Sequence, residues 1–166
     1  MSRFYNQTVL LYSIIHLLFS FITDVTPLIS EKNLPKLHLY LNDIITTKFN
    51  DPFMKRNAPD MIWFRSMLVA EMVIQIPLLI MIIFGLTGNK KPSKYTNLLH
   101  LVYGLHVSTT MIPVVGHLLC APELTNMEKT TLFGMYLPFA IVPFVMTIFS
   151  LKGIIVQLND IKPKLN

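Results

Sequence analysis

Residues 63–86 read WFRSMLVAEMVIQIPLLIMIIFGL, a long and mostly apolar stretch. It has the length and apolar content of a transmembrane helix, which needs roughly 20 mostly apolar residues to cross a bilayer. The stretch nevertheless contains Arg65, Glu71 and Gln75. Polar side chains are costly inside a membrane, and by default they mark a functional site. We therefore predict a membrane-spanning helix with one polar, functional face.

Three other stretches pass the same length test, at residues 4–23, 98–119 and 132–151. The whole chain is 52% hydrophobic and only 14% charged, and a soluble fold could not hide that much apolar surface. We predict an all-α membrane protein, a four-transmembrane-helix bundle with an intramembrane ligand pocket. We expect residues 1–166 to form a single domain, with helices at about 4–24, 61–86, 98–119 and 131–156.

The first of these stretches could instead be a cleaved signal peptide, because Arg3 supplies a basic start. Residues 20–30, SFITDVTPLIS, offer no cleavage site with small residues, and the apolar stretch is longer than a usual signal core. We expect it to be retained as the first helix.

The connection between the first two helices, residues 25–60, is too long for a hairpin. Its apolar residues recur at three- and four-residue spacing, which predicts an amphipathic helix against the membrane face or capping the bundle. They are Leu34, Leu37, Leu41, Ile44 and Ile45. Asp51 and Pro52 then resemble a helix start, because Asp is a favoured N-cap and Pro is tolerated next to it.

The basic residues give the expected orientation. With both termini in the cytosol, Lys and Arg divide seven and seven between the two sides. The short loop at residues 88–94, GNKKPSK, has the stronger influence on orientation, so we expect cytosolic termini. The chain ends KPKLN, and Lys162 and Lys164 match the dilysine retrieval signal of endoplasmic-reticulum membrane proteins. We therefore expect a multi-pass protein of that membrane.

Glu71 and Gln75 lie one turn apart on the second helix, so they share a face. That face either lines a polar cavity or joins neighbouring helices by hydrogen bonds. We favour the cavity, because a carboxyl group is costlier than an amide for simple helix pairing.

Each of the other three helices also has a polar or proline-containing face. On the first, the four-residue repeat of Tyr12, His16, Ser20 and Asp24 forms one polar edge, although Asp24 could equally be solvated at the membrane boundary. The third and fourth helices contribute Tyr103, His106, Thr110, Pro113, Tyr136, Phe139 and Pro143. Prolines inside helices free backbone carbonyls and bend the helix, which would make room for a ligand.

Several chemistries have no support in the sequence. We find no metal-binding spacing, phosphate loop, nucleophile elbow or dinucleotide fingerprint, so we expect no metal, no cofactor and no catalytic residue. The net charge of +5 is dispersed, which favours anionic lipid head groups over nucleic acid. Cys120 is the only cysteine, which excludes an internal disulfide.

Five stretches are the most specific part of the sequence: HLLFSFITD at 16–24, FNDPF at 49–53, WFRSMLVAEMVIQIP at 63–77, VYGLHVSTTMIP at 102–113 and MYLPFAIVPF at 135–144. They resemble successive blocks of the sigma-2 receptor family, part of the EXPERA group that also holds the emopamil-binding sterol isomerases. The resemblance covers nearly the whole chain. It is weakest at residues 30–47 and in the short loop before the fourth helix.

The resemblance implies a four-helix bundle in the endoplasmic-reticulum membrane, with a pocket that opens sideways to lipid and takes sterols and amphipathic amines. By the same resemblance, Asp24 binds the cationic amine and Asp51 braces Asp24 through a carboxyl hydrogen bond. Further lining positions are Glu71, Gln75, Thr110, His16 and Tyr136. The chain departs from the family at Ile45, which replaces an aromatic residue, and at Phe139, which replaces a tyrosine.

The leading functional prediction is a non-enzymatic protein that binds sterols or amphipathic amines and influences intracellular sterol distribution. A sterol double-bond isomerase is one alternative, because acids that bind amines can also move protons. A third is an adaptor at the endoplasmic-reticulum surface that handles mitochondrial precursor proteins. Candidate partners are a sterol or cationic amphipathic ligand, membrane lipids, a second copy in a homodimer and a sterol-transport protein.

Overall fold

The computed structural model describes residues 3–56, 59–87 and 95–161. It is 87% helical and has no strand in the described residues. Within them, four helical segments are long and apolar enough to cross a membrane: Arg3–Leu28, Ile62–Thr87, Thr96–Cys120 and Asn126–Asn159. This confirms the predicted all-α membrane protein with four transmembrane helices.

Only the third and fourth spans are single unbroken α-helices, α5 (Thr96–Cys120) and α6 (Asn126–Ile161). The first span consists of α1 (Arg3–Phe19), a π-helical turn at Ser20–Asp24 and a 3-10 turn at Thr26–Leu28. The second consists of α3 (Ile62–Ala70), a π-helical turn at Glu71–Gln75 and α4 (Ile76–Thr87). Two further 3-10 turns lie at Glu31–Asn33 and Pro59–Met61.

The fourth helix begins before residue 131, where the sequence analysis placed its start. A capping box explains the earlier start, because Thr125 and Glu128 satisfy each other's backbone N–H groups. The Thr125 N–H donates to Glu128 Oε2 at 2.7 Å, and the Glu128 N–H donates to Thr125 Oγ1 at 3.3 Å. The polar first turn therefore belongs to α6, although it lies outside the apolar stretch.

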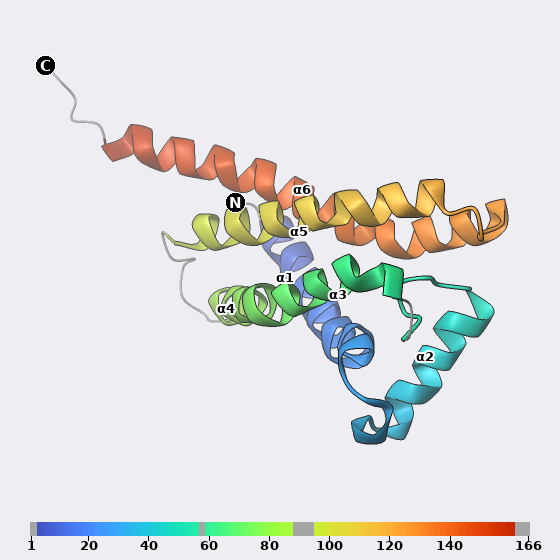
Figure 1. Cartoon of the computed structure of the whole chain (residues 1–166). Helices are drawn as coiled ribbons and strands as arrows, with labels where there is room; N and C mark the ends of the chain where they lie inside the picture. Colours follow the sequence, from blue (N-terminus) through green and yellow to red (C-terminus); the bar gives the residue numbers. More distant parts are fainter. Residues whose placement is uncertain (1–2, 57–58, 88–94, 162–166) are drawn as a thin grey trace, which may run out of the picture.

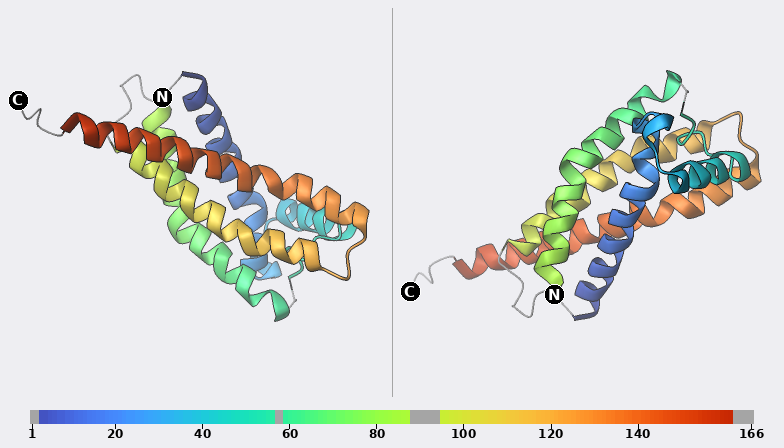
Figure 2. Two further views of the ribbon diagram at one scale, coloured as in Figure 1. Left: turned by 90° about the horizontal axis from the view of Figure 1, so that it is seen from above. Right: turned by 90° about the horizontal axis from the view of Figure 1, so that it is seen from below.

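The helices α5 and α6 form an antiparallel pair along most of their length (Figures 1 and 2). At Gly104 they come so close that a Cβ atom would lie 2.5 Å from the Pro143 carbonyl oxygen. The other two spans pack together through α1 and α4, and α1 also contacts α6. Figure 2 shows the start of α1 and the ends of α4 and α6 at one end of the bundle, with α2 (Lys36–Lys48) at the other.

The predicted amphipathic helix in the first connection is present as α2 (Lys36–Lys48). It lies beside the end of the first span, where His38 Nε2 is 3.0 Å from the Phe21 carbonyl oxygen (Figure 1). Ile45 packs against the core, whereas Leu37 and Tyr40 are exposed. The helix therefore covers one end of the bundle and turns apolar side chains outward.

The predicted helix start at Asp51 is wrong, because residues 50–56 are not helical. Asp51 Oδ1 instead accepts a hydrogen bond from the Phe53 N–H at 2.9 Å, which closes a turn within the segment itself. An aspartate can satisfy a backbone donor two residues ahead in a turn as well as at a helix N-terminus. The Asp51-Pro52 pair is therefore compatible with a helix start and with a turn.

The spans bury a narrow interior and expose an apolar exterior. Leu79, Tyr103 and Leu118 are completely buried, whereas Phe84 and Val73 point outward. Exposed apolar side chains of this kind suit a helix bundle whose solvent is lipid. The basic loop at 88–94 and the tail residues Lys162 and Lys164 lie outside the described residues, so the orientation stays a prediction.

Candidate ligand-binding site

A cavity of about 230 Å³ lies inside the bundle, between the two π-helical turns, α5 and α6. The side chain of Ile45 and the segment around Asp51 also line it. All seven residues proposed as ligand-binding from the sequence line this one cavity: His16, Asp24, Asp51, Glu71, Gln75, Thr110 and Tyr136. The remaining wall is mainly apolar and includes Phe19, Phe64, Leu68, Val107, Phe139 and four methionines, Met54, Met67, Met111 and Met135.

Two of the three carboxylates that line the cavity, Asp24 and Glu71, belong to the π-helical turns. Asp24 is the last residue of the first turn, and Glu71 is the first residue of the second. Pro77 follows the second turn and has no N–H, so the Val73 carbonyl lacks its usual partner four residues on. Such widened turns occur frequently at functional sites. Here they place both acids on the cavity wall.

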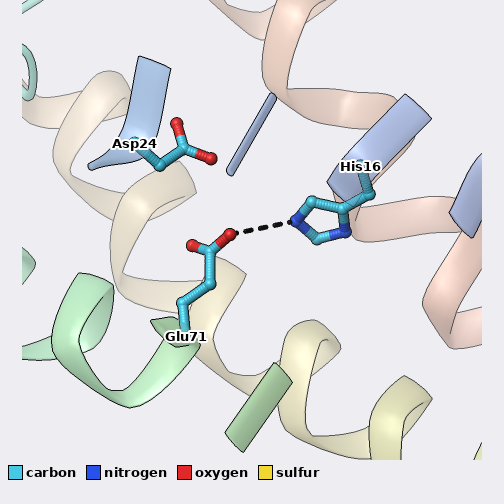
Figure 3. Close-up of side chains that lie close together, drawn as sticks. All are labelled: His16, Asp24 and Glu71. Atoms are coloured by element: carbon cyan, nitrogen blue, oxygen red, sulfur yellow. Dashed lines mark ion pairs between the residues drawn. The ribbon is translucent and has the colours of Figure 1, made fainter. Parts of the chain in front are cut away.

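Figure 3 shows Asp24, Glu71 and His16 directed toward one another. His16 Nε2 lies 3.4 Å from Glu71 Oε1. One ring nitrogen of His16 and one carboxylate oxygen each of Asp24 and Glu71 lie within 4.8 Å of one another. Glu71 also accepts a hydrogen bond from Ser20 Oγ. Glu71 therefore combines the two roles considered from the sequence, because it lines a cavity and also joins the first two spans.

Two tyrosines hold the His16 ring. His16 Nδ1 lies 2.5 Å from the Tyr103 hydroxyl and 3.2 Å from the Tyr12 hydroxyl, which leaves Nε2 facing Glu71. The Phe139 ring packs edge-on against the imidazole at 4.9 Å between centroids. Tyr12 and Tyr103 were on the polar faces found in the sequence but were not among the predicted site residues. The four-residue repeat from Tyr12 to Asp24 could have identified Tyr12 as a site residue. For Tyr103, the only indication in the sequence was its position on a polar helix face.

Asp51 has only 1% of its surface exposed. Its Oδ2 accepts a hydrogen bond from the Tyr136 hydroxyl at 2.8 Å, and its Oδ1 accepts the one from Phe53. Burial raises the pKa of this carboxyl above its ordinary value, and the bonds from Tyr136 and Phe53 partly oppose the increase. Among the hydrogen bonds of the described residues, none joins Asp51 to Asp24. In the cluster of Figure 3, Asp24 lies near the carboxylate of Glu71.

Thr110 and Gln75 complete the polar lining. The Thr110 hydroxyl donates to the Val107 carbonyl of its own helix at 2.9 Å, so one of its lone pairs can still accept from a ligand. Gln75 is 3% exposed and lies one turn beyond Glu71. The cavity therefore offers hydrogen-bond acceptors on two sides.

The charge of the cavity is unbalanced. Its described lining contains three carboxyl groups and one histidine, but no lysine or arginine. A buried carboxylate is costly unless a cation or several donors compensate it. The arrangement therefore favours either a shared proton or a cationic occupant.

The comparisons with known proteins agree with this architecture. A family model described as EBP, the EXPERA or expanded EBP superfamily, matches residues 35–150. Sigma intracellular receptor 2 of Xenopus tropicalis is 27% identical over 149 residues, which cover 84% of this chain and 84% of the relative. The protein of the same name from Homo sapiens is 25% identical over 155 residues, 86% of this chain and 85% of the relative. Every cavity-lining residue outside the first span lies within the matched range.

Proposed function

Because the chain belongs to the EXPERA family, the expanded EBP superfamily, we propose that it is a ligand-binding membrane protein of the sigma-2 receptor type. Its ligand is a sterol or a cationic amphipathic amine, bound in the intramembrane cavity. The observation that carries the proposal is the pair of carboxylates, Asp24 and Glu71, in a mainly apolar cavity whose described lining has no lysine or arginine. Such a site favours a ligand with one positive group on an apolar body.

An ammonium group would donate charge-assisted hydrogen bonds to Asp24, with Glu71 beside it. The apolar body of the ligand would lie against the aromatic and methionine side chains of the wall. Methionine is flexible and polarisable, so four of them can adapt to ligands of different shape. This lining supports binding of a class of amphipathic molecules by one cavity.

A sterol would use the same cavity differently. Its hydroxyl can both donate and accept a hydrogen bond, and its rings are apolar. It carries no charge, so its binding depends less on any single carboxylate. We further propose that the protein resides in the endoplasmic-reticulum membrane with cytosolic termini, and that it influences sterol distribution without catalysis.

One observation favours a second candidate, a sterol double-bond isomerase. His16 Nε2 and Glu71 Oε1 are 3.4 Å apart on the cavity wall, and such a pair could move a proton between two carbon atoms of a bound sterol. Sterol profiling after deletion of the gene separates the candidates. An accumulated double-bond isomer would indicate an enzyme, altered distribution would support the binding protein, and unchanged sterols would favour the adaptor role.

The direct test is equilibrium binding of a radiolabelled amphipathic amine and of a sterol to detergent-solubilised protein. Asp24→Asn is nearly isosteric and removes the negative partner of the amine, which should cost about 2 to 5 kcal/mol of amine binding. That corresponds to a loss of roughly thirtyfold or more. Sterol binding should change less.

Asp43→Asn is the matched control, because Asp43 is an exposed acid on α2. It should leave binding of both ligands unchanged, and melting curves should show that both variants are folded. Undiminished amine binding by a folded Asp24→Asn protein would rule out the proposed anchor. Absence of amine and sterol binding by the wild type would rule out the proposed function.

A further inference from the structure

We propose that His16, Asp24 and Glu71 form a binding site for a divalent transition-metal ion, and that zinc suits its ligands best. The three residues offer one imidazole nitrogen and two carboxylate groups, all on the cavity wall (Figure 3). The site uses the same anionic cluster as the proposed amine function, but its occupation by a metal does not depend on that function. The sequence predicted no metal site, because these residues lie at positions with no metal-binding spacing.

The distances suit a small ion. Zinc ligands lie about 2.0–2.1 Å from the metal, so two ligands of a tetrahedral site are roughly 3.4 Å apart. His16 Nε2 and Glu71 Oε1 are 3.4 Å apart. All three ligand atoms lie within 4.8 Å of one another, so a rotation of the Asp24 side chain would complete a three-ligand set. The fourth position would face the cavity.

The surrounding groups fix the ligands as expected around a bound metal. Histidine ligands usually donate their second ring N–H to a neighbouring group, which sets the tautomer and the ring orientation. His16 Nδ1 lies 2.5 Å from the Tyr103 hydroxyl, and Tyr103 is completely buried. If Nδ1 donates to this hydroxyl, the Nε2 lone pair is free for the ion. Ser20 donates to the carboxylate of Glu71 and orients it in the same way.

Charge and ligand type select the ion. Two facing carboxylates in an apolar cavity are fully neutralised by one divalent cation, whereas an ammonium group neutralises only one of them. Calcium requires six to eight oxygen ligands, and the imidazole of His16 suits zinc and neighbouring transition metals better. Both carboxylates also stand in π-helical turns, which often mark functional sites.

A second histidine–glutamate pair provides a matched control. His117 Nε2 and Glu123 Oε1 are 4.0 Å apart, but both side chains are partly exposed. The pair is not part of the three-residue cluster found among the described residues. It should therefore bind no metal with comparable affinity, although it has the same two side-chain types.

The test is titration of purified, detergent-solubilised protein with Co²⁺, whose visible absorption bands report tetrahedral coordination, followed by displacement with Zn²⁺. The wild type should bind one ion per chain. His16→Gln and Glu71→Gln should each weaken Co²⁺ binding by more than the roughly 10- to 100-fold that outer groups contribute. His117→Gln and Glu123→Gln should leave it unchanged. Melting curves recorded without metal check that each variant is folded, and Asp24→Asn serves as a nearly isosteric third variant.

Amine binding measured in the presence of a chelator separates this proposal from the proposed function. If the amine binds but Co²⁺ gives no tetrahedral spectrum, the metal site is overturned and the amine site stands. If Co²⁺ binds with the expected variant pattern and the amine does not bind, the metal site stands alone. Equal loss of Co²⁺ binding in the His117→Gln control, or unchanged binding in folded His16→Gln, would also overturn the metal site.

Discussion

At the scale of single residues, Asp51 is held by neutral donors. The Tyr136 hydroxyl and the Phe53 N–H donate to its two oxygens, and the side chain is almost completely buried. These bonds favour the ionised form, but burial opposes it more strongly and raises the carboxyl pKa. The folded protein therefore binds the Asp51 proton more tightly than the unfolded chain does.

This difference predicts how stability depends on pH. As pH rises above the unfolded pKa of about 3.9, the unfolded chain releases the Asp51 proton before the folded protein does. The free energy of unfolding contributed by Asp51 therefore decreases as pH rises from the unfolded to the folded pKa. Asp51→Asn removes this titration but can keep hydrogen bonds to Phe53 and Tyr136. Its melting temperature should accordingly rise relative to wild type as pH increases from the unfolded pKa toward the raised folded pKa.

Melting curves of both proteins in detergent at several pH values provide the measurement. The exposed Asp43→Asn variant should follow the wild type at every pH. A difference between wild type and Asp51→Asn that does not change with pH would contradict the raised pKa.

At the scale of secondary-structure elements, the pairing of α5 with α6 depends on Gly104. A Cβ atom there would lie 2.5 Å from the Pro143 carbonyl oxygen and 2.6 Å from Thr147 Oγ1. The first is a backbone atom and cannot rotate away, so the helices would have to separate. Small residues at such crossings allow close packing between membrane helices.

We predict that Gly104→Ala destabilises the protein by about 1 to 3 kcal/mol, the usual cost of overpacking. Gly116→Ala is the matched control, because Gly116 lies in the same helix and has nothing within 4 Å of an added Cβ. The control should be neutral or stabilising by up to about 1 kcal/mol, since alanine has the higher helix propensity. The measurement is the melting temperature of each variant relative to wild type. Equal melting temperatures of the two variants would contradict the close packing of α5 and α6 at Gly104.

At the scale of the whole molecule, the described residues contain four candidate spans, and this even number places the start of the first span and the end of the fourth on the same side of the membrane. Figure 2 shows α2 at the end opposite to the start of α1. If the termini are cytosolic, as the basic loop at 88–94 predicts, then the connection between the first two spans, which includes α2, faces the lumen.

Glycosylation tests this orientation. Asn6 begins the natural acceptor Asn6-Gln7-Thr8 and should remain unmodified in cells, because a cytosolic terminus never meets the lumenal enzyme. Pro35→Thr creates an acceptor at Asn33 in the first connection, and this site should gain a glycan. The readout is a shift in electrophoretic mobility that glycosidase treatment removes. A glycan on Asn6 would contradict the predicted cytosolic termini.

The carboxyl-terminal lysines make a separate prediction about location. Lys162→Ser together with Lys164→Ser should let the protein leave the endoplasmic reticulum, because the retrieval signal is read from the cytosol. Fluorescence microscopy of tagged protein measures this, with Lys152→Ser as a control lysine in α6. An unchanged location of the double variant would eliminate the retrieval signal.

The sequence predicted the four spans, and its resemblance to a known family pointed to seven of the residues that line the cavity. Long apolar stretches can satisfy their backbone groups in lipid only as helices, so Glu71 and Gln75 had to share a helix face. Which polar side chains contact one another depends instead on the tertiary structure. Asp51 could cap a helix or close a turn, and the folded chain has the turn, in which its Oδ1 accepts a hydrogen bond from the Phe53 N–H. The π-helical turns and the meeting of His16 with Glu71 likewise depend on packing between spans, which no local pattern encodes.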